Sequence, residues 1–285
     1  MKQIIWGTDL HYNFPKHHEL VEIHESIRAK IDSEVQSALS ENREPDETLA
    51  VIITGDTSEA HLLKSHLTLI RTQLKLPVFF VCGNHDYWKK KLSTTKELIT
   101  KMSEETDVKW LGAIPYAKLT EKTAIVGHDG WYDARYGDWE NSNFSMNDWN
   151  YIPEFHGKTK KQIVDFCREL AQKSTDHIEL GFKMAVDDGF KHIIVATHVP
   201  PFRESSIYGG RKSEETAVCW YTNCVLGEKL YELSFENPDV DVTVLCGHTH
   251  NGITNKILKN LTVHVGSAQY YNPSYRFVGL WEGEI

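Results

Sequence analysis

The chain has 285 residues, of which 40% are hydrophobic and 25% are charged, an ordinary balance for a soluble globular protein. This length suits one large domain or two small ones, and it allows a sizeable buried core. The net charge of −9 and the pI near 5.9 argue against a protein that grips a long phosphate backbone, because such proteins usually present a basic patch.

Strand-like and helix-like runs alternate along most of the chain. Apolar residues at helical spacing predict helices over residues 18–39, 59–74, 94–104, 161–172, 179–188 and 226–235. Strands are expected near residues 2–8, 49–54, 78–82, 122–127, 191–197 and 241–246. Three more strands, at 252–258, 261–265 and 276–281, follow without a helix between them, which suggests antiparallel strands that close a sheet. Two packed sheets flanked by helices fit this order.

Residues 130–155 are rich in aromatic side chains and have no clear period. A stretch of this length is too long for a simple connection, and its aromatic content argues against disorder. We interpret it as a packed lid over a functional site. The alternative is a satellite hydrophobic cluster that only supports the fold.

No apolar run approaches the ~20 residues that span a bilayer, and the N-terminus has no signal-peptide layout, so we expect a cytoplasmic protein without membrane contact. The number of cysteines is odd, and Cys82 and Cys246 fall in predicted core strands, as is typical of reduced structural thiols. Cys219 and Cys224 lie close together in a loop-like stretch, but no second pair completes a zinc site.

Side chains that bind metals follow nearly every predicted strand. They are Asp9 and His11, then Asp56, then Asn84, His85 and Asp86, then His198, and finally His248 and His250, with Glu59 shortly after the second strand. Open α/β sheets place their sites at strand ends, where segments distant in sequence meet. One such histidine alone is more often a surface residue, but five clusters in register with five strand ends indicate a two-metal hydrolytic site.

The types of these residues limit which metal ions they could bind. Asp9 and His11 are two apart, so their side chains leave the same face of an extended chain, and His248 and His250 repeat that spacing. Carboxylate with imidazole suits Zn, Mn, Fe or Co rather than Ca. The clusters contain no cysteine, which favours an open catalytic site over a structural zinc site.

Three further side chains have expected roles. The Asp56 carboxylate can bridge two metals, and Asn84 offers a neutral amide oxygen. His85 follows Asn84 directly and is therefore held near the metals without being a ligand, which suits a general acid. An acidic residue should orient its imidazole, and Glu59 and Asp86 are the candidates.

The order of these motifs resembles the calcineurin-like metallophosphoesterases. The matching motifs are Asp9-x-His11, Gly55-Asp56, Gly83-Asn84-His85-Asp86, His198 and Gly247-His248-x-His250, and they cover most of the chain. The resemblance implies an α/β fold, a four-layer αββα sandwich of two mixed sheets between helices. It implies one such domain over residues 1–285, with the aromatic segment as an insertion.

The resemblance also implies a dinuclear centre. The ligand types leave Mn, Fe, Zn and Co open, and Mn²⁺ is the choice for assays. One ion would be held by Asp9, His11, Asp56 and His250, and the other by Asp56, Asn84, His198 and His248. Asp56 and a hydroxide would bridge the ions, the hydroxide would attack phosphorus in line, and His85 would protonate the leaving oxygen.

One departure from the family bears on the substrate. Protein serine/threonine phosphatases of this superfamily carry Gly-Asp-x-x-Asp-Arg, in which the arginine binds phosphate. In this chain Glu59 occupies the position of the last aspartate of that motif, which orients the catalytic histidine, and Ala60 occupies the position of the arginine. Protein phosphatase activity of that type is therefore doubtful. Arg135, Arg203 and Arg211 lie in nearby loops, each either a substitute for that arginine or a solvated surface residue.

We therefore expect an enzyme that hydrolyses a small or medium phosphate ester, either a monoester or a diester. A nuclease on the same scaffold is the alternative, which the acidic pI disfavours. A non-catalytic scaffold is less consistent with the sequence, because every ligand position is filled.

Overall fold

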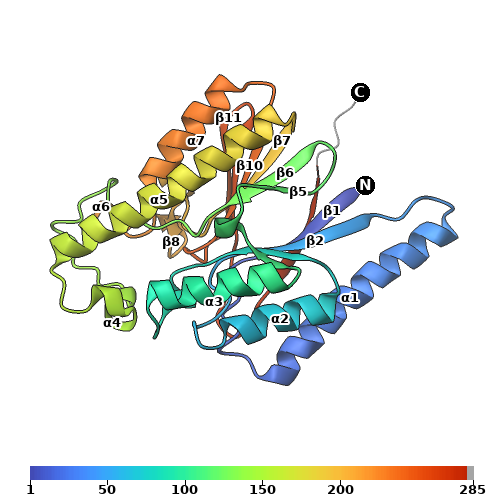
Figure 1. The fold of residues 1–285 in the computed structure, drawn as a ribbon, viewed down its shortest axis with the longest axis horizontal. Coiled ribbons are helices and arrows are strands. Elements are labelled where there is room, and N and C mark those ends of the chain that lie inside the picture. Colours follow the sequence, from blue (N-terminus) through green and yellow to red (C-terminus); the bar gives the residue numbers. More distant parts are fainter. Residues whose placement is uncertain (281–285) are drawn as a thin grey trace.

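The computed structural model describes residues 1–280 as two β-sheets packed between layers of helices (Figure 1). The first sheet has the order β13-β1-β2-β3-β4. Strands β1 to β4 run parallel, and β13 is antiparallel to β1. Their bounds are β1 Lys2–Gly7, β2 Glu47–Thr54, β3 Val78–Val81, β4 Val108–Trp110 and β13 Tyr275–Gly279.

The second sheet has the order β11-β12-β10-β7-β6-β5. Its four central strands, β12, β10, β7 and β6, are parallel, and β11 and β5 are antiparallel edge strands. The bounds are β5 Ala117–Lys118, β6 Thr123–Gly127, β7 His192–Ala196, β10 Asp241–Cys246, β11 Ile253–Leu258 and β12 Leu261–Val265. A separate hairpin joins β8 (Ile207–Tyr208) to β9 (Arg211–Lys212).

Helices cover the outer face of each sheet. The helices α1 (His17–Ser40), α2 (Leu63–Leu74) and α3 (Leu92–Glu105) lie against the first sheet, and α5 (Lys160–Asp187) and α7 (Cys224–Glu236) lie against the second (Figure 1). Short helical turns occupy the connections: α4 Asp148–Tyr151, α6 Glu215–Val218, η1 His85–Tyr87, η2 Leu111–Ala113, η3 Pro153–Phe155 and η4 Arg203–Ser205.

The apolar runs in the central strands follow from burial on both faces. In β1, Ile4 faces the apolar layer between the sheets, whereas its neighbour Ile5 packs toward the helices. Ile194 and Ile193 in β7 divide in the same way. Neighbouring strand residues point to opposite faces, and both faces are covered, so each strand is apolar throughout. Full burial of each such side chain stabilises the fold by about 1.5–3 kcal/mol.

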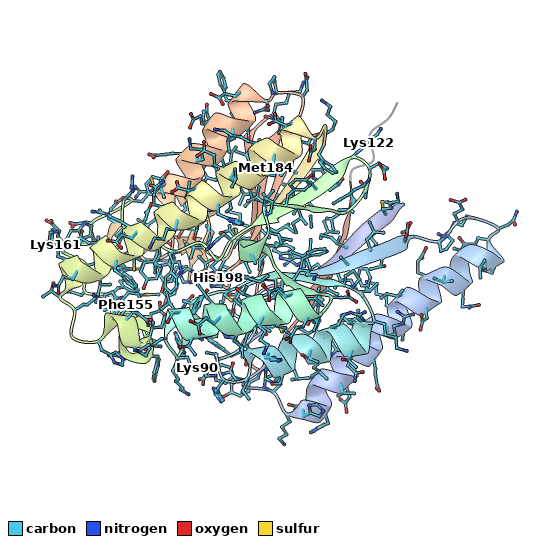
Figure 2. The ribbon with its side chains drawn as sticks, viewed as in Figure 1. Lys90, Lys122, Phe155, Lys161, Met184 and His198 are labelled. Carbon is cyan, nitrogen blue, oxygen red and sulfur yellow. The ribbon has the colours of Figure 1, made fainter. Side chains whose placement is uncertain are left out.

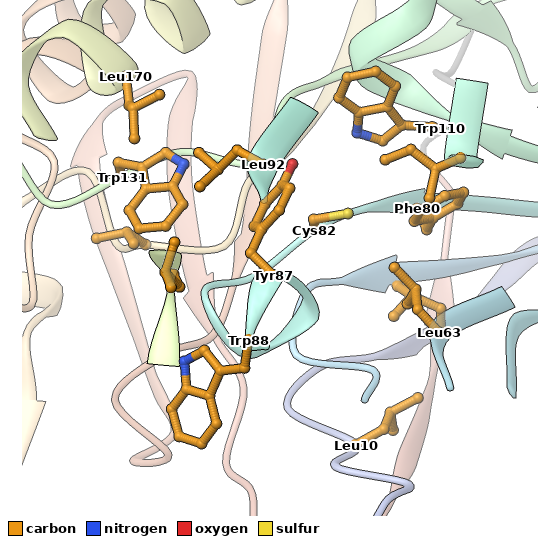
Figure 3. Close-up of a cluster of buried hydrophobic side chains, with 14 of the residues drawn as sticks. Leu10, Leu63, Phe80, Cys82, Tyr87, Trp88, Leu92, Trp110, Trp131 and Leu170 are labelled. Carbon is orange, nitrogen blue, oxygen red and sulfur yellow. The ribbon is translucent and has the colours of Figure 1, made fainter. Parts of the chain in front are cut away.

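The layer under α1 to α3 is the largest apolar cluster, and it extends beyond the sheet. Figure 3 shows Phe80 and Leu63 on one side of it and Trp131 and Leu170 on the other, with Tyr87 between them. The aromatic segment that follows β6 is therefore continuous with the main core.

The structure confirms the predicted four-layer architecture and corrects two helix boundaries. Residues 161–172 and 179–188 were predicted as two helices, but α5 runs unbroken through both. The polar residues between them include Ser174 and Thr175, which are buried and donate hydrogen bonds to the carbonyls of Leu170 and Ala171 at 3.0 and 2.9 Å. Hydroxyls bonded to the preceding turn are compatible with a helix interior.

The second correction concerns α2, which begins at Leu63 and not at residue 59. The C-terminal strands also differ from a simple antiparallel closure, because β11 and β12 extend the second sheet and β13 joins the first. Trp281, the last residue of the final predicted strand, lies outside the described residues.

Candidate metal centre

The predicted ligands come together at the carboxyl ends of strands from both sheets. Asp9 and Asp56 follow β1 and β2 of the first sheet, and His198 and His248 follow β7 and β10 of the second. Backbone hydrogen bonds join neighbouring loops, from Asp9 N to Gly55 O at 3.0 Å and from Gly247 N to His198 O at 2.9 Å. Figure 2 places His198 near the middle of the molecule, between the two helical layers.

Five of these residues adopt a left-handed backbone conformation. The φ angles are 49° at Asp9, 44° at His11, 50° at Asp56, 69° at His248 and 57° at His250. Positive φ is uncommon for residues other than glycine and costs about 1–3 kcal/mol when the surroundings impose it. These sharp turns direct the side chains of several loops toward one point, and such strained residues are typical of functional sites.

Two glycines leave room for the carboxylates. A Cβ atom at Gly83 would collide with Oδ1 of Asp56, and one at Gly247 would collide with Oδ2 of Asp9. The glycines of the Gly-Asn-His-Asp and Gly-His-x-His motifs are therefore required for close approach of the backbone to the acidic residues.

The first donor set consists of Asp9, His11, Asp56 and His250, whose ligand atoms all lie within 4.8 Å of one another. The Nε2 atoms of His11 and His250 are 3.1 Å apart, and Nε2 of His250 is 3.4 Å from Oδ1 of Asp9. Thr8 Oγ1 and the backbone N–H of His248 donate hydrogen bonds to the Asp9 carboxylate and hold it in place. Two carboxylates and two imidazoles in this space form a ready site for one divalent cation.

The second donor set converges on the amide oxygen of Asn84. Nε2 of His198 and Nδ1 of His248 each lie 3.1 Å from Asn84 Oδ1, and Nε2 of His198 is 3.5 Å from Oδ2 of Asp56. The other nitrogen of each ring lies at hydrogen-bond distance from a backbone carbonyl, that of Thr54 at 2.9 Å and that of Trp220 at 3.0 Å.

These carbonyls determine where the ring lone pairs point. In the neutral form that binds a metal, each imidazole has one N–H, which would donate to Thr54 O or Trp220 O, so the facing nitrogens would present lone pairs to an amide oxygen that can only accept. Acceptors face acceptors, and a cation between them removes the conflict. The side chains therefore fit a second metal ion, with Asp56 available to both.

The pKa values of the site histidines also indicate that the buried carboxylates attract positive charge. Burial would lower the pKa of His198, but the Asp56 and Asp9 carboxylates outweigh it and raise the pKa to about 10. Burial lowers the pKa of His11 to about 3 and that of His248 to about 4. Without metal, the two buried carboxylates favour the protonated form of His198 and also raise the pKa of His250, so metal binding must release protons.

His85 lines the site but contacts neither of its predicted partners. Its backbone N–H donates to Oδ1 of Asp56 at 2.9 Å, and its ring stacks on Trp88 with centroids 3.6 Å apart. Both Asp86 oxygens accept backbone N–H groups, from Ser58 and Gly83, which join the loops after β2 and β3.

The other predicted partner, Glu59, binds Lys89 Nζ at 2.6 Å. Among residues 1–280, the buried Nδ1 of His85 has no hydrogen-bond partner. Stacking on Trp88, rather than a carboxylate, therefore sets the orientation of the His85 ring in this structure.

Asp148, a fully buried carboxylate on α4 in the aromatic segment, was not predicted as a site residue from the sequence. Its Oδ1 accepts hydrogen bonds from Asn84 Nδ2 and Trp88 Nε1, both at 2.8 Å, and its Oδ2 accepts one from the Tyr132 hydroxyl at 3.1 Å. Asp148 thereby turns the oxygen of Asn84 toward the histidines. A lone aspartate in an aperiodic segment carries no signal for this role.

A cavity of about 380 Å³ opens beside the donor sets. Its walls include Trp88, Tyr208, Tyr221 and Tyr270 as well as residues 145–148 of the aromatic segment. In the same segment, Trp131, Tyr132 and Phe155 are buried in the main core. The segment thus supports the fold and forms part of the pocket wall, combining features of both interpretations.

The structure also describes the cysteines and the apolarity of the helices. All five cysteines are free and buried, and the thiols of Cys219 and Cys224 contact the Thr216 carbonyl and the Glu228 carboxylate. Within residues 1–280, no helix combines the length and apolarity that crossing a bilayer requires.

Comparisons with known proteins agree with this geometry. The sequence model of the family described as calcineurin-like phosphoesterase matches residues 4–252. The chain is similar in structure to a phosphopantetheinyl hydrolase from Mycobacterium tuberculosis, with a TM-score of 0.61 and 14% identity over 95% of this chain and 90% of that one. It is also similar to a dimetal phosphatase from Danio rerio, with a TM-score of 0.55 and 12% identity over 98% and 93%. At these identities the likeness concerns the fold. No protein of curated function matches the chain.

Proposed function

This chain belongs to the calcineurin-like phosphoesterase family, and we propose that its substrate is a small or medium-sized organic phosphate ester. The family acts on phosphoric ester bonds with the help of metal ions, so metal-dependent phosphoester hydrolysis is the general activity. We also propose the class of ester and the roles of individual residues. We further propose that residues 1–285 form a single domain.

The observation that carries the proposal is the pair of converging donor sets with Asp56 between them. Asp9, His11, Asp56 and His250 would hold one ion, and Asp56, Asn84, His198 and His248 would hold the other. Bound divalent ions supply a water nucleophile at neutral pH and neutralise charge that grows on the phosphoryl oxygens. The protein's part is to aim these side chains and to hold them in place through Thr54, Trp220 and Asp148.

We assign proton transfer to the leaving oxygen to His85. Its ring lies at the pocket wall, is only 12% exposed, and has its Nε2 3.8 Å from Oδ2 of Asp56. Stacking on Trp88 and the hydrogen bond from its backbone N–H to Asp56 hold it close to the donor sets without making it a ligand. A proton on Nε2 would face the same space as the scissile bond, as a general acid requires.

The pocket supports a small substrate over a nucleic acid. A cavity of about 380 Å³ is within the range of small-molecule sites. Among residues 1–280, no lysine or arginine lines it, whereas a nucleic-acid channel would need basic side chains to follow the backbone.

The test is a paired assay on the purified protein reconstituted with Mn²⁺, with 4-nitrophenyl phosphate as monoester and bis(4-nitrophenyl) phosphate as diester. We expect metal-dependent turnover of at least one ester, and the preferred ester assigns the class. Absence of turnover on both, with metal bound, contradicts the proposal.

The assignment of His85 is tested by varying the leaving group. His85→Asn should reduce kcat about 10²-fold or more for an alkyl ester but much less for a 4-nitrophenyl ester, because the aryl oxygen leaves without protonation. His61→Asn, a substitution at an exposed histidine nearby, should change neither rate. Equal losses on both esters would show that His85 acts in another way.

A further inference from the structure

Among residues 1–280, no lysine or arginine side chain lines the pocket. A phosphate ester brings at least one negative charge, and enzymes commonly bind phosphate oxygens with arginine, which offers two parallel N–H donors. Beside the donor sets, the walls of the cavity are formed by His85, Met146, the Asp148 carboxylate and otherwise by aromatic, amide and hydroxyl side chains. A basic side chain that serves the substrate must therefore come from the rim.

Of the three arginines that the sequence places in nearby loops, two have acidic partners. Arg135 lies 3.6 Å from Asp133, and Arg203 forms an ion pair with Glu215. Arg211 is exposed and has no ion-pair partner among residues 1–280. It is thus the one of the three whose guanidinium is available to an anion.

The hairpin that carries Arg211 has a defined geometry. Gly209 and Gly210 form its two-residue turn, with φ of 57° and 76°, the combination found in type I′ turns. Tyr208 pairs directly with Arg211, and Ile207 pairs with Lys212. Directly opposed residues share a face, and neighbours along a strand alternate, so Arg211 lies on the face of Tyr208 and Lys212 on the opposite face.

The face of Tyr208 is the face toward the pocket. Tyr208 lines the cavity and stacks on Tyr221, another lining residue, with centroids 5.0 Å apart and planes at 19°. The rings of Phe144 and Tyr208 also pack in a T-shaped arrangement, with centroids 6.1 Å apart. The backbone N–H of Gly210 donates to Oδ1 of Asn251, which lies on the pocket wall, at 3.2 Å. These contacts hold the tip of the hairpin at the mouth of the pocket.

We propose that Arg211 binds the phosphate group of the substrate from the hairpin at the pocket mouth. The inference rests on the proposed function and adds to it a binding residue that the family motifs do not include. Arg211 would supply the positive charge and the paired donors that the walls lack. Lys212 carries the same charge on the other face of the same strand and is therefore a matched control.

The experiment measures binding of inorganic phosphate to the Mn²⁺-loaded protein by titration calorimetry, alongside steady-state kinetics on the preferred 4-nitrophenyl ester. Arg211→Gln should weaken phosphate binding about tenfold and raise KM by a similar factor, with kcat within about twofold, because a charge-assisted contact is lost. Arg211→Lys should lose less, since it keeps the charge but not the fork. Lys212→Gln should change either quantity less than about twofold.

Two results would overturn the inference. Phosphate affinity unchanged in Arg211→Gln would remove Arg211 from the site. Equal weakening in Arg211→Gln and Lys212→Gln would reduce the effect to the general charge of the hairpin. In both cases turnover by the wild-type protein leaves the proposed function standing. Failure of the proposed function is distinct, because the wild-type protein would then turn over neither ester.

Discussion

Replacing Asp148 with alanine should destabilise the protein by about 3 kcal/mol. The substitution leaves three buried donors without an acceptor: Asn84 Nδ2, Trp88 Nε1 and the Tyr132 hydroxyl. Each unpaired buried donor costs about 1–3 kcal/mol, and the total falls at the lower end because the hydroxyl rotates and the amide turns over. That rotation of Asn84 removes its oxygen from His198 and His248, so affinity for the second Mn²⁺ should also fall about 10–100-fold.

Asp148→Asn provides the sharper comparison. Its carbonyl oxygen can take the place of Oδ1, which accepts from both Asn84 and Trp88, and its amide group can donate to the Tyr132 oxygen. We therefore expect a loss of only about 1 kcal/mol and nearly normal metal affinity, because Asn84 and Trp88 keep their acceptor and the Tyr132 hydroxyl is the one donor that loses its own.

Urea unfolding of the metal-free proteins and calorimetric titration with Mn²⁺ measure these two effects. Asp239→Ala, at an exposed aspartate on the surface, is the control and should change stability by less than about 0.5 kcal/mol. The reasoning is refuted if the alanine and asparagine variants lose the same stability and affinity, because the loss would then follow from charge and not from stranded donors.

Three further predictions concern other parts of the molecule. Gly247→Ala places a Cβ where Asp9 Oδ2 lies and should weaken Mn²⁺ binding at the first donor set, as measured by calorimetry. Burial lowers the pKa of His128 to about 4 from 6.5. Between pH 4 and pH 6.5 the folded state therefore binds fewer protons than the unfolded chain. The contribution of His128 to the free energy of unfolding is complete above pH 6.5 and is lost as the pH falls toward 4, by up to about 3 kcal/mol. In His128→Gln, urea unfolding should show a shallower fall. Leu67→Ala, under the first sheet, should cost about 2–5 kcal/mol while the number of bound Mn²⁺ ions stays the same.

The sequence was informative where chemistry and periodicity coincide. Strands buried on both faces read as continuous apolar runs, so β1, β2, β3, β7 and β10 were predicted close to their observed bounds. Polar residues that directly follow such runs stand out against them. The seven predicted ligands converge for this reason, since strand ends of both sheets meet at one place.

Other features depend on tertiary contacts that leave no local pattern. The break expected near residue 175 does not occur, because Ser174 and Thr175 satisfy their hydroxyls within α5 and are buried. The role of Asp148 arises only when α4 packs against Asn84. The β8–β9 hairpin contains just two residues per strand, too few to show an alternation.

The orienting partner of His85 is a similar case. Glu59 and Asp86 are close to it in sequence, but one faces Lys89 and the other faces backbone N–H groups of Ser58 and Gly83. Sequence distance alone does not determine which carboxylate an imidazole meets.

The central claim is that two donor sets share Asp56 and hold two metal ions that support hydrolysis. The most direct test is elemental analysis of Mn²⁺ bound to the dialysed wild-type protein and to His198→Ala, with ester turnover measured on the same samples. The account predicts two ions per chain in the wild type and one in His198→Ala, with turnover reduced at least about 10²-fold because the second ion is lost. Two ions and full turnover in His198→Ala would contradict it.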